Sequence, residues 1–324
     1  MLKKKVSQLE IIPKIEKAAN EKKGRILTLV LLTGTIVLTL SFWLLGQWRR
    51  GQLSFPHWSV DIKKPSFNLP DGNNQDLPEN LDQWARENLS QLPGQWAIRV
   101  EFLNSDFVWS WQGEQSMPAT SLIKLPVVAA FYRQVEMGKL ELEDIHVLKS
   151  SEMIAGSGSL QNQAPGTKVS LGELARLALS QSDNTAFAIL RDLVGKQEID
   201  DYLSVWGMEE TSLEDNLTSA KDVAVFFQSL YQNKILSEEF SQKMLEDMTK
   251  TIYEDRIPAG VPEGIRVAHK VGSEVGVVSD AGIVYVPGKP FILVILSQDT
   301  KEATAKEAFP ELANQIYWLL TNNY

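Results

Sequence analysis

The sequence contains no cysteine, which excludes disulfide bonds and thiolate chemistry. It has only three histidines, His57, His146 and His269, which lie too far apart to indicate a metal site and show no Ser-His-Asp order. We therefore expect no metal and no cofactor. His269 adjoins Lys270, where it could tune the charge of that lysine or simply pack within a strand.

Positive charge is scarce outside the N-terminal region. Residues 1–50 hold ten Lys/Arg and three Asp/Glu, a net charge of +7, and subtracting this from the whole-chain −9 leaves −16 on residues 51–324. An acidic domain of this kind argues against nucleic acid as a partner.

Long hydrophobic runs are absent except for one near the N-terminus. Residues 26–45 carry no charge, and 20 residues at about 1.5 Å each cross a hydrocarbon core of about 30 Å. This run predicts a transmembrane helix over residues 26–48. A cleaved signal peptide is the alternative, but residues 46–50 offer no small-residue cleavage site.

The charges beside this run predict its orientation. Residues 1–25, a basic tail, contain eight Lys/Arg, whereas only Arg49, Arg50, Lys63 and Lys64 follow on the other side before residue 78. The positive-inside rule places the tail in the cytoplasm and the rest of the chain outside it. We expect a single-pass protein of the cytoplasmic membrane whose main domain faces the periplasm or cell wall.

Residues 49–77 have the composition of a linker, with Pro56, Pro65 and Pro70 and a polar Asp-Gly-Asn-Asn stretch. Residues 78–324 are long enough for one domain with a substantial core. Strand patterns occur at both ends of this domain, with helical patterns between them. This order predicts an α/β (α+β) fold, in which both chain ends complete an antiparallel sheet and a helical lobe is inserted. The expected strands cover residues 95–103, 107–111, 265–271, 277–286 and 291–297, and the expected end helices cover 78–92 and 301–320.

Three short motifs carry the functional signal, in the order Ser121-Leu122-Ile123-Lys124, Ser182-Asp183-Asn184 and Lys270-Val271-Gly272. Each alone has an ordinary explanation, because serine and aspartate commonly begin helices. However, Ser-x-x-Lys and Ser-Asp-Asn each occur once in the chain. Their order indicates a serine acyl-transfer site that uses lysine in place of histidine.

The spacing of the first motif suits this chemistry. Ser121 begins an apolar run, which predicts the first turn of a buried helix with Lys124 on the same face. A helix start also offers a free N–H group and a positive dipole to an oxyanion. Lys124 can take the serine proton only when neutral, which requires burial or a second cation nearby, such as Lys270.

With these motifs, residues 78–324 resemble the class A β-lactamases and the penicillin-binding D,D-peptidases. Further shared features are Gly166 with the helix at 170–179, Gly207-Met208 and Asp280-Ala281-Gly282. The resemblance implies that Ser121 is the nucleophile and Lys124 its base. It also implies a proton relay at Ser182, substrate positioning by Asn184, electrostatic support from Lys270, substrate contacts at Gly272 and Ser273, and an oxyanion hole formed by the N–H groups of Ser121 and Ser273.

The chain departs from the family pattern at two places. Val271 replaces the usual threonine or serine, so recognition of a substrate carboxylate would depend on Ser273. The segment from Gly207 to Asp222 is short and lacks a secure counterpart of the glutamate that activates the deacylating water. Glu214 is the nearest candidate for this glutamate. We expect it instead to be an exposed acid that flanks a helix.

We therefore expect a membrane-anchored serine hydrolase that is acylated at Ser121 and cleaves β-lactam amide bonds with slow deacylation. One alternative is a cell-wall D,D-peptidase, or penicillin-binding protein, acting on peptides that end in D-Ala-D-Ala. The second alternative is a domain that binds wall material without turnover.

Overall fold

The computed structural model of the chain describes residues 76–321. The predicted basic tail, the transmembrane helix over residues 26–48 and the linker up to residue 75 lie outside the described residues. Between residues 76 and 321, none of the helices combines the length and the apolar character needed to cross a membrane.

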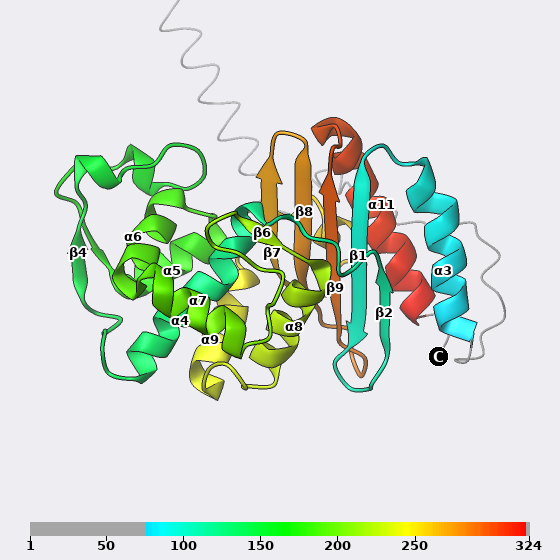
Figure 1. Cartoon of the computed structure of the whole chain (residues 1–324), viewed down its shortest axis with the longest axis horizontal. Coiled ribbons are helices and arrows are strands. Elements are labelled where there is room, and N and C mark those ends of the chain that lie inside the picture. Colours follow the sequence, from blue (N-terminus) through cyan, green and yellow to red (C-terminus); the bar gives the residue numbers. More distant parts are fainter. Residues whose placement is uncertain (1–75, 322–324) are drawn as a thin grey trace, which may run out of the picture. The chain divides into compact units, whose positions relative to one another are not determined.

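A five-stranded antiparallel sheet forms the centre of the described domain, in the order β2-β1-β9-β8-β7 (Figure 1). Strand β1, from the start of the domain, pairs with β9, from its end. This pairing confirms the prediction that both ends of the chain complete one sheet. The strands are β1 Gln95–Phe102, β2 Val108–Trp111, β7 Val267–Glu274, β8 Val277–Val284 and β9 Phe291–Gln298.

Both faces of the sheet are covered, as strand β9 illustrates. Its residues from Phe291 to Leu296 are all fully buried, which explains their continuous apolar sequence. Leu293 and Ile295 pack into a core with the two terminal helices of the domain, whereas Val294 and Leu296 pack into the core of the helical lobe. The alternation follows the two-residue period of a strand.

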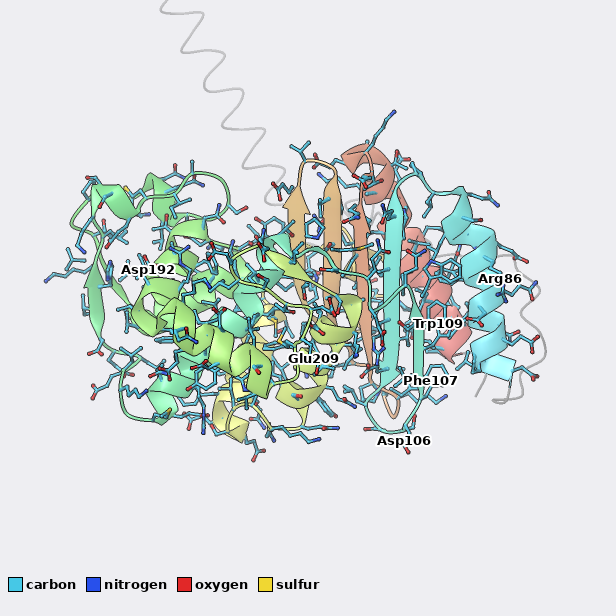
Figure 2. The ribbon with its side chains drawn as sticks, viewed as in Figure 1. Arg86, Asp106, Phe107, Trp109, Asp192 and Glu209 are labelled. Carbon is cyan, nitrogen blue, oxygen red and sulfur yellow. The ribbon has the colours of Figure 1, made fainter. Side chains whose placement is uncertain are left out.

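One face of the sheet packs against helices from both ends of the domain, α3 (Leu77–Asn88) and α11 (Glu302–Thr321) (Figure 1). The short helix η2 (Leu89–Gln91) follows α3, and α10 (Ile257–Gly260) contacts α11. Trp109 of β2 reaches α3, where its indole N–H donates to Asp82 Oδ1 at 2.9 Å (Figure 2).

The opposite face carries the helical lobe, which holds most of the remaining helices (Figure 1). Serine side chains cap two of its helices: Ser170 accepts from the N–H of Glu173, and Ser219 from that of Asp222. The helices are η3 Thr120–Ile123, α4 Lys124–Glu136, η4 Ser150–Glu152, η5 Leu160–Asn162, α5 Leu171–Ser180, α6 Asn184–Val194, α7 Lys196–Val205, α8 Ala220–Tyr231 and α9 Glu238–Met248.

Two small strand pairs were not predicted. Strand β3 (Met117–Pro118) pairs with β6 (Leu217–Thr218), and β4 (Ile145–Val147) pairs with β5 (Lys168–Ser170). Strands of two or three residues are too short to show a periodic pattern. The β3–β6 pair matters for the site, because it fixes the chain immediately before Ser121 against the segment that follows Asn216.

Candidate active site

Ser121 lies in the turn that leads into α4. This turn, η3, is a 3₁₀ helix, and the α-helix begins only at Lys124. The prediction that Ser121 lies in the first α-helical turn is therefore wrong by one turn. The side chains of Ser121 and Lys124 are nevertheless in contact. The Lys124 ammonium donates to Ser121 Oγ at 3.0 Å.

Lys124 is 2% exposed and lies among several acceptors. Its Nζ is 2.5 Å from the carbonyl oxygen of Ser182, 3.1 Å from Ser182 Oγ and 2.7 Å from Asn184 Oδ1. Burial lowers the pKa of Lys124 to about 8, against the opposing charge of Asp183. At this pKa about a tenth of the lysine is neutral at pH 7. Of the two causes considered from the sequence, burial is the main one.

The second motif connects α5 to α6. Ser182 has a positive φ of 55°, and its side chain is turned toward Lys124. Asp183 is fully buried and caps α6 by accepting from the N–H of Ala186 at 2.9 Å. Its other oxygen accepts from the N–H of Leu160 at 2.8 Å. Asp183 therefore fixes both the start of α6 and the loop that covers it, which holds Ser182 in place.

Lys270 of β7 completes a continuous line of contacts. Its Nζ donates to Ser182 Oγ at 2.8 Å and to the carbonyl of Val271 at 3.0 Å. Burial, followed by the charge of Lys124, holds the pKa of Lys270 well below its usual range, while Asp280 opposes this shift. Ser182 Oγ thus lies between two lysine nitrogens, one of which also contacts the hydroxyl of Ser121.

Gly272 allows β7 to approach η3 closely. A Cβ atom at this position would lie 2.1 Å from Thr120 Oγ1 and 3.3 Å from the carbonyl of Ala119. The approach brings Ser273 to the same cavity as Ser121, Lys124 and Asn184, with a volume of about 380 Å³. The oxyanion hole formed by the N–H groups of Ser121 and Ser273 stays a prediction.

Arg256 is a site residue that the sequence analysis missed. Its side chain is almost completely buried, and its Nη1 donates to the carbonyl of Gly272 at 2.8 Å. Its Nη2 donates to Ser273 Oγ at 2.5 Å. Arg256 belongs to no motif and lies in a segment without periodicity, so no local signal identified it. The guanidinium gives Ser273 a positively charged neighbour. Val271, which is buried, has no hydroxyl to offer at this end of β7.

The segment between Gly207 and Asp222 gives the cavity little acidity. Leu213 and Asn216 line the cavity, whereas Glu214 is 73% exposed and pairs with Lys196 at 3.5 Å. The exposed position expected for Glu214 agrees with this arrangement. Among the described residues that line the cavity, Glu274 on β7 is the only acid.

Comparisons with known proteins agree with this geometry. The sequence model of the Beta-lactamase enzyme family matches residues 79–320. The chain belongs to this family. It is therefore an enzyme of the serine hydrolase type, as the three motifs predicted.

The chain is similar to one curated relative and to two solved structures at 25–26% identity. The extended-spectrum beta-lactamase PER-1 of Pseudomonas aeruginosa is 25% identical over 216 residues, covering 59% of this chain and 70% of the relative. The structure of PBP-A is similar with a TM-score of 0.70 and 26% identity, covering 79% of this chain and all of PBP-A. A leucine-to-glutamate variant of PBP-A, with a TM-score of 0.69 and 26% identity over 78% of this chain and 100% of that one, was solved as an acyl-enzyme complex with penicillin G.

Proposed function

We propose that this protein is a membrane-anchored serine enzyme that β-lactams acylate at Ser121 and that releases the acyl group slowly. The observation that carries the proposal is the position of Lys124, whose buried Nζ contacts both Ser121 Oγ at 3.0 Å and Ser182 Oγ at 3.1 Å. One amine thus reaches both the attacking hydroxyl and the hydroxyl that serves the leaving group.

Acylation follows from this arrangement. Neutral Lys124 takes the proton of Ser121 as its oxygen attacks the lactam carbonyl carbon, giving a tetrahedral oxyanion. The C–N bond then breaks, and the hydroxyl of Ser182 gives its proton to the leaving nitrogen. Lys124 then passes the proton that it took from Ser121 on to Ser182. Both Ser182 and Lys124 are therefore back in their starting protonation states after acylation. Lys270, whose Nζ donates to Ser182 Oγ at 2.8 Å, stabilises negative charge on Ser182 during the transfer.

The carboxylate on the leaving side of the substrate would bind at the end of β7. Ser273 Oγ lies in the cavity, and the buried guanidinium of Arg256 donates to it. A hydroxyl beside a cation can bind a carboxylate by charge-assisted hydrogen bonding. Ser273 with Arg256 therefore takes the role that Val271 cannot fill.

Slow release of the acyl group is inferred from the side of the cavity that Leu213 and Asn216 line. Deacylation requires a base that activates water close to the ester at Ser121. Glu214, the acid next to Leu213, points to solvent and pairs with Lys196, and the lining positions of the segment from Gly207 to Asp222 are Leu213 and Asn216, which are not acids.

The same chemistry supports a second function, a D,D-peptidase of the cell wall. Its substrate would be a peptide ending in D-Ala-D-Ala, whose terminal carboxylate occupies the position given above to the β-lactam carboxylate. The positions of Leu213 and Asn216, which offer no base, favour this alternative, because slow hydrolysis leaves time for transfer of the acyl group to another acceptor. Binding of wall material without turnover is a third possibility, and the experiment below distinguishes it.

Mass spectrometry of the full chain in detergent tests these functions. The protein is incubated with penicillin G, and the adduct on the peptide that contains Ser121 is followed over time. A persistent adduct supports slow release and a peptidase, a transient adduct supports a β-lactamase, and no adduct supports a non-catalytic domain. An adduct on another serine would contradict the assignment.

Anchorage in the membrane is the remaining part of the proposal. It is supported by the uncharged run at residues 26–45 and the excess of Lys/Arg before it. Protease added outside cells without an outer barrier should cut near residues 51–77 and release a soluble fragment. A reporter fused after Tyr324 should work only if it functions outside the cytoplasm, and activity of a cytoplasmic reporter would overturn the orientation.

A further inference from the structure

The Asp280-Ala281-Gly282 sequence of β8 has no role in the acylation steps, yet it lies directly beside the third motif. In the β7–β8 register, Val271 pairs with Asp280, Lys270 with Ala281 and His269 with Gly282. Side chains at directly opposed positions of an antiparallel pair project to the same face. Asp280 therefore projects to the same face as Val271, and His269 and Ser273, two residues before and after Val271, share this face, whereas Lys270 projects to the other.

Both oxygens of the Asp280 carboxylate are used, and the side chain is completely buried. Oδ1 accepts from the Nδ1–H of His269 at 2.8 Å, and Oδ2 accepts from the backbone N–H of Ile257 at 3.0 Å. The second bond attaches β8 to the residue that follows Arg256. Asp280 thus connects β8 both to β7 and to the first residue of α10.

His269 has the space it needs because its partner on β8 is glycine. A Cβ atom on Gly282 would lie 2.6 Å from His269 Cβ and 2.2 Å from the carbonyl of Ala268. His269 is itself completely buried, so its ring can occupy only the position beside Asp280. Of the two roles considered for His269, packing within the strand agrees with this burial, and the ring also contacts Asp280.

The side chain of Arg256 bonds to residues of both β7 and β8. Besides its bonds to Gly272 and Ser273, its Nη1 also donates to the carbonyl of Ser279, the residue before Asp280. The guanidinium thus crosses from β8 to the end of β7. Asp280 is also a buried negative charge that raises the pKa of Lys270 against the effect of Arg256 and burial.

We propose that Asp280, oriented by His269 and given space by Gly282, is a positioning residue that fixes Arg256 and thereby prepares Ser273 to bind the carboxylate of the substrate. The inference rests on the proposed function, since it concerns the same acylation site. It assigns to the pair a role in substrate selection: substrates with a carboxylate on the leaving side depend on Asp280, and substrates without one do not.

The test compares acylation of the full chain by penicillin G and by its methyl ester, which lacks the carboxylate. Asp280→Ala should lower the second-order acylation constant for penicillin G about 10- to 100-fold, the range for loss of charge-assisted hydrogen bonding. The constant for the ester should fall by a smaller factor, because the Ser121–Lys124–Ser182 contacts do not involve Asp280 and only the loss of a charge that raises the pKa of Lys270 affects both substrates. Asp280→Asn retains an acceptor for the N–H of Ile257 and should restore most of the lost selectivity.

Ser297→Ala is the matched control, because Ser297 is a buried polar residue of the same sheet whose hydroxyl donates to the carbonyl of Val278, away from Arg256 and Asp280. It should leave both constants unchanged. If Asp280→Ala does not fold, Asp280→Asn and His269→Gln carry the test, and each should show a smaller but selective loss with penicillin G.

Equal losses with both substrates, or an equally selective loss in Ser297→Ala, would overturn the inference while leaving the proposed function intact. A wild-type protein acylated by neither substrate would overturn the proposed function, and the inference with it.

Discussion

Two walls of the active-site cavity differ in what they offer to the reaction. The wall formed by η3, α4, the start of α6 and β7 holds a line of hydrogen bonds through Ser121, Lys124, Ser182 and Lys270. The wall formed by Leu213 and Asn216 offers an apolar side chain and an amide. The first wall contains what acylation needs, whereas the second lacks a base for release. Under the proposed function, acylation and release of the acyl group therefore depend on different walls.

The first wall should be the more sensitive to mutation. Ser121→Ala should abolish the adduct with penicillin G, because Ser121 is the only serine between residues 76 and 321 that both contacts Lys124 and lines the cavity. Lys124→Ala should slow acylation by about 10²- to 10⁴-fold, the usual contribution of a general base. Both are measured by mass spectrometry of the intact chain. Unchanged acylation in Lys124→Ala would remove the functional difference between the walls.

The pH dependence tests how the first wall is activated. Only neutral Lys124 accepts the serine proton, and its pKa is lowered to about 8. Below this pH the neutral fraction falls about tenfold per pH unit, so acylation should be about tenfold faster at pH 7 than at pH 6. The pKa of Lys270 is also lowered, so loss of its proton as the pH rises should oppose this gain in rate. Because the two lysines share Ser182, the observed values belong to the pair.

Rates of acylation under single-turnover conditions give this profile. Lys124→Ala is the control and should lack the rise between pH 6 and pH 8. A flat wild-type profile over the same range would mean that another group takes the proton.

The second wall can be given the base it lacks. Leu213→Glu places a carboxylate in the cavity and should accelerate release of the acyl group by about tenfold or more, as expected when a base activates water. The reaction with penicillin G should still begin with a burst of about one equivalent of product per enzyme, since the first wall, which forms the acyl-enzyme, is unchanged. Leu213→Gln is the control of matched shape, and faster release in that variant would attribute the effect to polarity alone.

The smallest effect is expected at Glu214. This side chain is 73% exposed and pairs with Lys196 at 3.5 Å, and exposed ion pairs contribute little. Glu214→Gln should change the steady rate after the burst by less than about twofold, because the carboxylate does not line the cavity. Slower release in this variant would show that Glu214 reaches the acyl-enzyme and that the two walls are more alike than their geometry indicates.

Much of the fold could be predicted from the sequence because its strands and helices are long and strongly patterned. The five-stranded sheet, its pairing of distant segments and the terminal helices follow from runs such as Phe291 to Leu296. The paired segments β3–β6 and β4–β5 could not be predicted, since they are too short to show a period and depend on tertiary contacts.

The site was predictable where residues form motifs and not where they meet only in space. Ser121, Lys124, Ser182 and Lys270 were found by spacing, and the structure brings them together. Arg256 and the contact between His269 and Asp280 depend on how α10 packs against β7 and β8, which leaves no mark in the local sequence. The 3₁₀ geometry at Ser121 was also missed, because a 3₁₀ turn and an α-helix share the same apolar pattern over four residues.

The pairing of β1 with β9 has a consequence for how the chain reaches this structure. Residues 95–102 bond to residues 291–298, so the central part of the sheet cannot close until nearly the whole polypeptide has been synthesised. Until then β1 has only β2 beside it, and contacts between such distant segments are slow to form. Lys270 can reach Ser182 only after β7 has joined this late-forming sheet. An incomplete chain therefore has the serine and its neighbouring lysine but not the assembled reactive centre, and chemical competence is acquired with the final strands.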